Sequence, residues 1–132
     1  MSKMHIHISG ENLEESIKFY SSLFGSQPTK LKNDYAKWML DDPSVNFAIS
    51  ARGAAVGIDH IGIQAENEDE MQVLRDRINA ADIDTFDDGP AVCCYSKSDK
   101  SWIQDPSGIA WETYHTMDEA NFFNEASPKN VL

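Results

Sequence analysis

Polar and branched apolar residues alternate near the start of the chain and again in its middle. The run His5-Ile-His-Ile and the run His60-Ile-Gly-Ile follow a similar pattern, 55 residues apart. Alternation with a period of two is typical of a β-strand that buries one face. The pattern therefore predicts a short strand at each place and, because the two runs match, a repeated structural unit.

A helix is predicted after each of these strands. In both Asn12-Leu-Glu-Glu15 and Asn67-Glu-Asp-Glu70, a Glu follows an Asn by three residues. This spacing suits a helix start at which the Asn side chain accepts from the first-turn amides and the Glu reaches back. Gly25 is expected to end the first helix. The apolar residues that share one face of each helix are Leu13, Ile17, Tyr20 and Phe24, and then Met71, Leu74 and Ile78.

A strand, a turn with Asp-Pro and another strand are predicted towards the end of each unit. Residues 38–50 and residues 102–114 share this order. A further short strand is expected within residues 27–32 and within residues 84–87. The order β-α-β-β-β is thus predicted to occur twice.

The two β-α-β-β-β modules are predicted to form one α+β domain over residues 1–132. Module one covers about residues 4–50 and module two about residues 58–115, with a small-residue linker at 51–57 and a tail at 116–132. One module alone leaves a face of its sheet bare, so the two sheets are expected to form a metal-binding cleft with the helices outside. A chain of this length can bury one such core.

Two histidines and one glutamate are the candidate ligands of a metal ion. His5 and His60 open equivalent strands, so the packing of two similar modules would bring them opposite each other. Glu112 lies in the last strand of module two, whereas its counterpart in module one is Ala48. Two imidazoles and one carboxylate leave three coordination positions open, which suits Fe(II), although the same set accepts Zn, Ni, Mn or Co.

Two further polar residues are expected beside these ligands. His7 shares a strand face with His5, and Gln64 shares one with His60. His7 is expected either next to the metal ligands or as a competing ligand from module one. Each residue taken alone has a plainer explanation, because a histidine in a strand is usually structural and a lone glutamate is usually exposed. The equivalence of the two histidines favours the metal site.

Charge and composition exclude several classes of partner. The chain has 22 acidic and 11 basic residues and a net charge of -11, with no cluster of Lys and Arg. Nucleic acid and anionic membranes are therefore poor partners, and no apolar run approaches the roughly 20 residues that cross a bilayer. The only cysteines, Cys93 and Cys94, adjoin each other, which favours reduced thiols and a cytoplasmic location.

From residue 4 to about residue 115, the chain resembles the vicinal-oxygen-chelate superfamily of glyoxalases, bleomycin resistance proteins and extradiol dioxygenases. The resemblance rests on the two histidines and on Asp105-Pro-Ser-Gly-Ile-Ala-Trp-Glu112, which is similar to the closing hairpin of that family. It implies that His5, His60 and Glu112 bind a catalytic metal ion. Members of the family often dimerise, so contact between two copies of the chain is also expected.

A narrower resemblance rests on Cys93-Cys94-Tyr95, Asp99-Lys-Ser-Trp102 and Asp34-Tyr-Ala-Lys37. These segments resemble the organoarsenical carbon–arsenic lyases and the cadmium-inducible proteins grouped with them. The resemblance implies that Cys93 and Cys94 bind a trivalent organoarsenical while Fe(II) and dioxygen cleave its carbon–arsenic bond, with Tyr95 near the metal ligands. Adjacent residues of a regular strand point to opposite faces, so both sulfurs can hold one atom only in an irregular segment.

Two other functions stay open on the sequence alone. One is a different reaction of the same superfamily, such as extradiol ring cleavage or a glyoxalase-type, lactoylglutathione lyase-like isomerisation, although Ala48 removes the carboxylate that a glyoxalase would use as a fourth ligand. The other is a non-enzymatic protein that binds cadmium or a small toxic compound. Thiolates are soft donors that suit cadmium(II) as well as arsenic(III).

Overall fold

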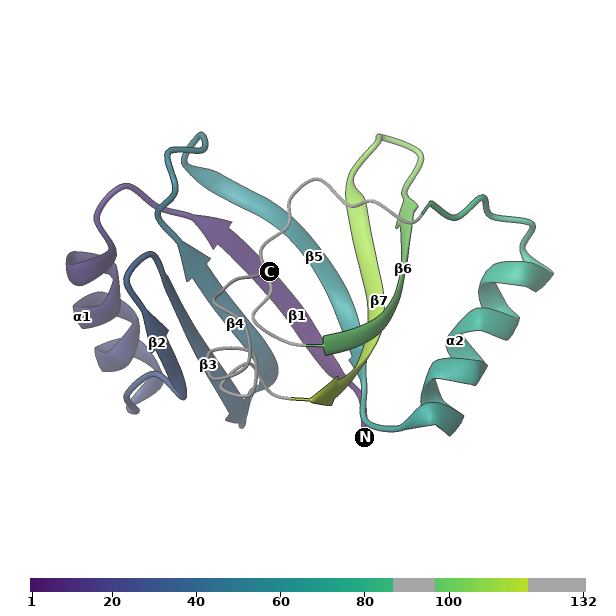
Figure 1. Cartoon of the computed structure of the whole chain (residues 1–132), viewed down its shortest axis with the longest axis horizontal. Helices are drawn as coiled ribbons and strands as arrows, with labels where there is room; N and C mark the ends of the chain where they lie inside the picture. The colour runs from purple at the N-terminus through teal and green to yellow at the C-terminus, as the bar shows by residue number, and fades with distance from the viewer. Residues whose placement is uncertain (87–96, 119–132) are drawn as a thin grey trace. The chain divides into compact units, whose positions relative to one another are not determined.

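The computed structural model describes residues 1–86 and 97–118 (Figure 1). Along the chain, the elements are β1 (Lys3–Ser9), α1 (Leu13–Phe24), β2 (Lys30–Lys32), β3 (Tyr35–Asp41), β4 (Ser44–Ser50), β5 (Gly57–Ala65), α2 (Glu68–Ala80), β6 (Lys97–Gln104) and β7 (Ala110–Asp118). The protein therefore has a mixed α+β fold, as predicted. None of the helices in the described ranges is long and apolar enough to cross a membrane.

The chain divides into two compact parts. The first part is Lys3–Ile61, and the second part is Met1–Ser2 together with the residues from Gly62 on. Strand β5 begins in the first part and ends in the second. Hydrogen bonding orders the strands β2-β3-β4-β1-β5 in the first part and β5-β7-β6 in the second.

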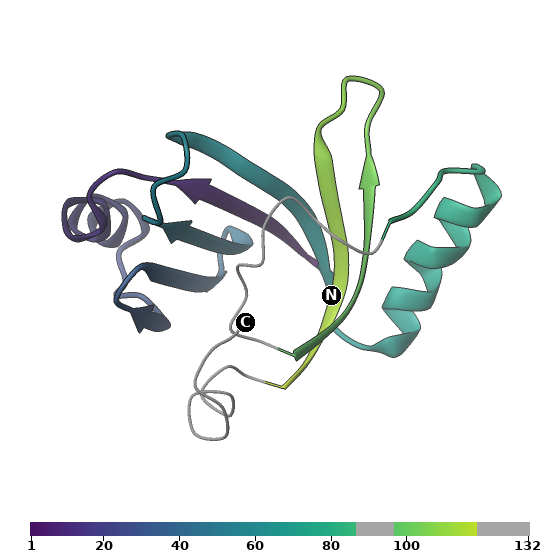
Figure 2. The ribbon, with the colours of Figure 1, turned by 45° about the horizontal axis from the view of Figure 1, so that its top comes forward.

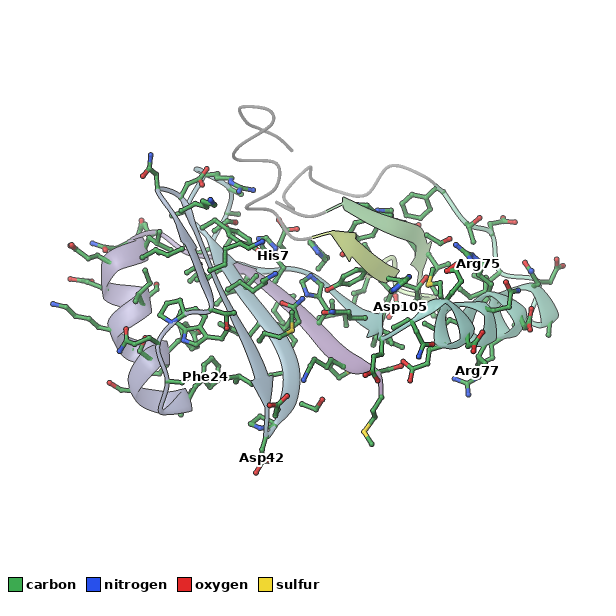
Figure 3. All side chains as sticks on the ribbon, turned by 60° about the horizontal axis from the view of Figure 1, so that its bottom comes forward. His7, Phe24, Asp42, Arg75, Arg77 and Asp105 are labelled. Carbon is green, nitrogen blue, oxygen red and sulfur yellow. The ribbon has the colours of Figure 1, made fainter. Side chains whose placement is uncertain are left out.

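Strands β1 and β4 of the first part run parallel, whereas β3 and β4 form an antiparallel hairpin. Helix α1 packs against β3 and β4, and Phe24 points from the helix towards these strands (Figures 2 and 3). The hairpin turn contains Asp42, labelled in Figure 3. The buried apolar residues under α1 are Ala36, Trp38, Val45, Phe47 and Ile49.

Both helices begin at the predicted Asn. The amide of Glu15 donates to the side chain of Asn12 at 3.0 Å, and the amide of Glu70 donates to that of Asn67 at 2.9 Å. The side chain of Glu70 accepts from the amide of Glu66, one residue before the cap. Each cap satisfies backbone donors that a helix start leaves without intrahelical partners. Gly25 ends α1 with a φ of 70°, a left-handed conformation that suits glycine.

The second part packs α2 over its strands through a smaller apolar cluster. Met71 and Leu74 are buried there with Ala65, and Ile63 packs against them. Ile78 of the predicted helix face is also buried. Of the short strand expected within residues 84–87, the described residues 84–86 contribute one isolated bridge, between Phe86 and Trp102.

The two predicted hairpins differ in register by one residue. Trp38 pairs with Phe47 in the first part, whereas Trp102 pairs with Glu112 in the second. Directly paired residues lie on the same face of a sheet. Trp38 and Phe47 therefore both face helix α1, but Trp102 shares a face with Glu112. The sequence parallel between the two tryptophans does not extend to the side of the sheet on which they lie.

Candidate metal centre

Three histidines gather on one face of the first part. His5 and His7 of β1 are 3% and 1% exposed, and His60 of β5 is 1% exposed. The alternate residues Ile6 and Ile8 pack against the apolar core under α1. Because side chains alternate along a strand, the histidines lie on the face opposite to the helix, and Figure 3 labels His7 there.

The imidazoles of His5 and His60 approach each other through one nitrogen each. Their Nε2 atoms lie 3.2 Å apart. Nδ1 of His5 lies 3.2 Å from the carbonyl oxygen of Asn46, and Nδ1 of His60 lies 2.7 Å from a carboxylate oxygen of Asp59. Both partners accept hydrogen bonds, so each Nδ1 carries the proton and donates it. Each Nε2 then presents a lone pair towards the other ring.

This pairing fits a shared cation. Two lone pairs at 3.2 Å repel unless a positive charge lies between them. Imidazole nitrogens bind transition metals at about 2.1 Å, so two of them in adjacent coordination positions lie roughly 3.0–3.4 Å apart. The hydrogen bonds from Nδ1 to a backbone carbonyl and to a carboxylate are those that commonly orient metal-binding histidines. His5 and His60 are thus arranged so that they could hold one metal ion between them.

His7 completes a group of three imidazoles that could hold a metal ion. One ring nitrogen of each of His5, His7 and His60 lies within 4.8 Å of the others. Nε2 of His7 lies 2.9 Å from the hydroxyl of Ser50. Burial, followed by the charges of His60 and His5, lowers the pKa of His7 from 6.5 to about 3. His7 is therefore neutral at physiological pH, which is the state in which an imidazole can bind a metal ion.

Glu112 lies in the second part, as the third residue of β7. Its side chain is buried, and Nζ of Lys100 lies 3.5 Å from its Oε2. A Cβ atom built on Gly62 would overlap the main-chain oxygen of Glu112 and lie 3.2 Å from its Cβ, so β5 and β7 approach closely there. The hydroxyl of Tyr114 donates to Oε1 of Gln64 at 3.2 Å. Gln64, Glu112 and Tyr114 therefore share a face of the second part.

Sequence reasoning proposed the two histidines and the glutamate as ligands, which stays a prediction, and it missed the polar groups beside them. Asp59 and Ser50 hold two of the imidazoles, and Lys100 lies beside the carboxylate. A signal was available for Asp59, which adjoins His60 in the sequence. Cys93, Cys94 and Tyr95 lie outside the described residues. The participation of Glu112 with the two histidines stays a prediction.

A family model describes most of the chain. The model of the Glyoxalase/Bleomycin resistance protein/Dioxygenase superfamily matches residues 4–113. The chain belongs to this superfamily. The resemblance inferred from the two histidines and the closing hairpin is thereby confirmed.

Named relatives fall in the narrower group that the sequence indicated. A trivalent organoarsenical cleaving enzyme of Bacillus sp. (strain MD1) is 40% identical over 119 residues, which are 88% of this chain and 74% of that protein. The cadmium-induced protein CadI of Mycobacterium bovis is 27% identical over 131 residues, 98% of this chain and 86% of that protein.

The 2,3-dioxygenase LapB of Pseudomonas sp. KL28 has a similar fold, with a TM-score of 0.63 and 21% identity over 96% of this chain and 45% of that one.

Proposed function

We propose that His5, His60 and Glu112 bind one divalent metal ion, with Fe(II) as the native ion. The observation that carries the proposal is the 3.2 Å pair of Nε2 atoms, whose orientation is set by Asn46 and Asp59. Nitrogen and carboxylate ligands in this ratio suit Fe(II) and leave coordination positions open. The ion would supply the redox chemistry with dioxygen, and the residues around it would orient its ligands.

The inclusion of Glu112 is supported by its place in the second part. Glu112 lies beside Gly62, and Gly62 follows His60 by two residues on β5. Residues two apart on a strand share a face. A buried carboxylate also needs a positive partner, and a metal ion would supply one together with Lys100. Gln64 and His7 are the neighbours from which we expect hydrogen bonds around the ion.

The reaction we propose is cleavage of the carbon–arsenic bond of trivalent organoarsenicals, with dioxygen as the oxidant and inorganic arsenite as a product. It is supported by the name of the Bacillus relative at 40% identity. Cys93 and Cys94 are proposed to bind the arsenical through their thiolates, because trivalent arsenic prefers soft sulfur donors, and Tyr95 is proposed to lie near the metal ligands.

A direct test loads the protein with Fe(II) without oxygen, then adds methylarsenite and air. We expect arsenite release from the wild type, and loss of release with retained iron in C93S and C94S. In H60Q and E112Q, both iron and release should fall. H115Q is the matched control, because His115 lies 3.7 Å from Glu68 of α2 and not among the proposed ligands. Iron-loaded wild type that releases no arsenite would refute the reaction.

A second candidate is binding of cadmium without turnover, which the likeness to the cadmium-induced protein favours. It predicts that cadmium binds in proportion to protein, that C93S and C94S abolish this binding, and that E112Q leaves it unchanged. The two candidates differ in one readout, because only the lyase converts methylarsenite to arsenite beyond one equivalent of protein.

A further inference from the structure

The three-histidine group, made of His5, His7 and His60, lies entirely in the first part of the molecule. All three residues fall within Lys3–Ile61, whereas Glu112 belongs to the second part. The three side chains are buried, and one ring nitrogen of each lies within 4.8 Å of the others. The first part therefore contains three potential metal ligands that do not depend on Glu112.

The spacing of the histidines along and across the strands explains why their rings gather. His5 and His7 are two residues apart on β1, so both side chains lie on the same face of the sheet. His60 lies on β5, the strand next to β1. The ring centroid of His60 is 5.1 Å from that of His5 and 5.0 Å from that of His7, while those two are 6.3 Å apart. The three rings therefore form a triangle with His60 about equally far from the other two.

The three-histidine group needs only a small adjustment to bind one ion. A tetrahedral ion about 2.1 Å from each nitrogen holds its ligand atoms roughly 3.4 Å apart. The Nε2 atoms of His5 and His60 already lie 3.2 Å apart. The ring nitrogen of His7 must therefore approach the other two by no more than roughly 1.4 Å, a shift that a rotation about the torsions of one side chain can produce.

Each imidazole of the group also has a hydrogen-bonding partner on one ring nitrogen. For His7 the partner is Ser50, whose hydroxyl lies 2.9 Å from Nε2. An imidazole has two ring nitrogens, so a hydrogen bond at one allows the other to bind a metal ion. The carboxylate of Asp59, 2.7 Å from Nδ1 of His60, adds a negative charge beside ligands that are neutral when they bind a metal ion.

Three imidazoles favour a different class of ion from the ligand set proposed for iron. Zn(II) binds three histidines in tetrahedral sites whose fourth position stays open to water or another small ligand. Imidazole nitrogens suit zinc, copper and nickel, whereas carboxylate oxygens suit harder ions. The donor atoms of the three-histidine group thus match a borderline ion such as Zn(II).

We propose that the three-histidine group binds Zn(II) without Glu112, as a second mode of metal binding. In this mode His7 is a ligand, whereas in the iron-bound mode it is a neighbour of the ion. The inference rests on the two histidines of the proposed function, but not on its carboxylate, its iron or its substrate. Zinc bound in this way competes with iron for His5 and His60.

Zinc binding to the full-length variant E112L and to the double variants E112L/H7Q and E112L/H115Q tests the inference. Leucine has no donor atom, and the amide of glutamine is a weaker zinc ligand than imidazole. H115Q is the matched control, because His115 lies 3.7 Å from Glu68 and outside the three-histidine group. Competition with a chromogenic chelator measures the dissociation constant. We expect E112L to bind one zinc ion, and E112L/H7Q to bind zinc at least about 10-fold more weakly than E112L/H115Q, because one of three protein ligands is lost.

The number of imidazoles bound to zinc gives a second measurement, by X-ray absorption at the zinc edge of zinc-loaded E112L. We expect three imidazoles, and this count decides if E112L/H7Q does not fold. If E112L does not fold, E112Q takes its place in both measurements.

Three results overturn the inference. They are E112L that binds no zinc, a difference of less than about 10-fold between the two double variants, and a count of two imidazoles or fewer. Failure of the proposed function is seen separately, as iron-loaded wild type that releases no arsenite.

Discussion

At the scale of single residues, the candidate metal centre depends on protons held in fixed places. Asp59 accepts from Nδ1 of His60 at 2.7 Å, and the carbonyl of Asn46 lies 3.2 Å from Nδ1 of His5. These contacts leave both Nε2 atoms as lone-pair donors to a metal ion. The chemistry of the site is therefore set as much by the neighbours of the histidines as by the histidines themselves.

Replacement of Asp59 by asparagine tests this orientation. D59N keeps the size of the side chain but loses the charge that holds the Nδ1 proton of His60. We expect Co(II) affinity to fall about 10- to 100-fold, the usual effect of removing such a partner. Competition with a chromogenic chelator measures it, and D84N, at an exposed position, is the control. Unchanged affinity in D59N would show that the carboxylate does not orient the ligand.

At the scale of elements, the sequence predicted where the helices begin better than it predicted the register between paired strands. The capping asparagines and the apolar faces of α1 and α2 are local signals, and the structure confirms both helix starts. The register of the β6–β7 hairpin cannot be predicted from neighbouring residues, because it depends on how Trp102 packs once the two strands have paired. A shift of one residue moves a side chain to the other face of the sheet, so Trp102 and Trp38 differ despite similar surroundings in sequence.

The cap of α2 gives a prediction at this scale. N67A removes the side-chain acceptor of the Glu70 amide, and we expect the free energy of unfolding to fall by about 1 kcal/mol. Urea unfolding measures the change. N79A, at an exposed position in the last turn of α2, should have a smaller or opposite effect, because alanine has a higher helix propensity than asparagine. Equal losses in both variants would contradict the role of the cap.

The close approach of β5 and β7 gives another prediction. In G62A the added methyl group would overlap the main chain of Glu112, which cannot rotate away. We expect a loss of stability of about 1–3 kcal/mol and a loss of metal affinity, because the strand that carries the carboxylate must shift. I63A is the control, since it weakens the apolar cluster under α2 without touching Glu112. If both variants lose stability but neither loses affinity, Glu112 does not bind the ion.

At the scale of the whole molecule, the repeat read from the sequence explains why ligands so far apart in the chain are candidates for one site. His5 lies in β1 and His60 lies in β5, the strands that the repeat makes equivalent, and the structure brings their rings together within the first part. Glu112 is a candidate because of its place in the last strand of module two and because of the family resemblance, but its burial could not be derived from the sequence of that strand. Ser50 contacts His7 only because the folded sheet brings β4 beside β1, and Asp59 holds the ring of its neighbour His60.

Metal binding should also stabilise the whole chain. An ion that binds only the folded state raises the free energy of unfolding by about 2.7 kcal/mol at 100 times its dissociation constant. We expect the unfolding midpoint of the wild type to rise with Co(II) concentration and that of H60Q to rise much less. Calorimetry with and without a chelator measures both. An equal rise in H60Q would mean that the ion binds elsewhere.

The proposed metal centre requires that His5 and His60 bind one metal ion together. X-ray absorption at the iron edge, on Fe(II)-loaded wild-type protein kept without oxygen, counts the imidazoles bound to the ion. We expect at least two imidazoles, with oxygen ligands in the remaining positions at about 2.1 Å. A first shell with one imidazole or none, or one made of sulfur, would contradict it.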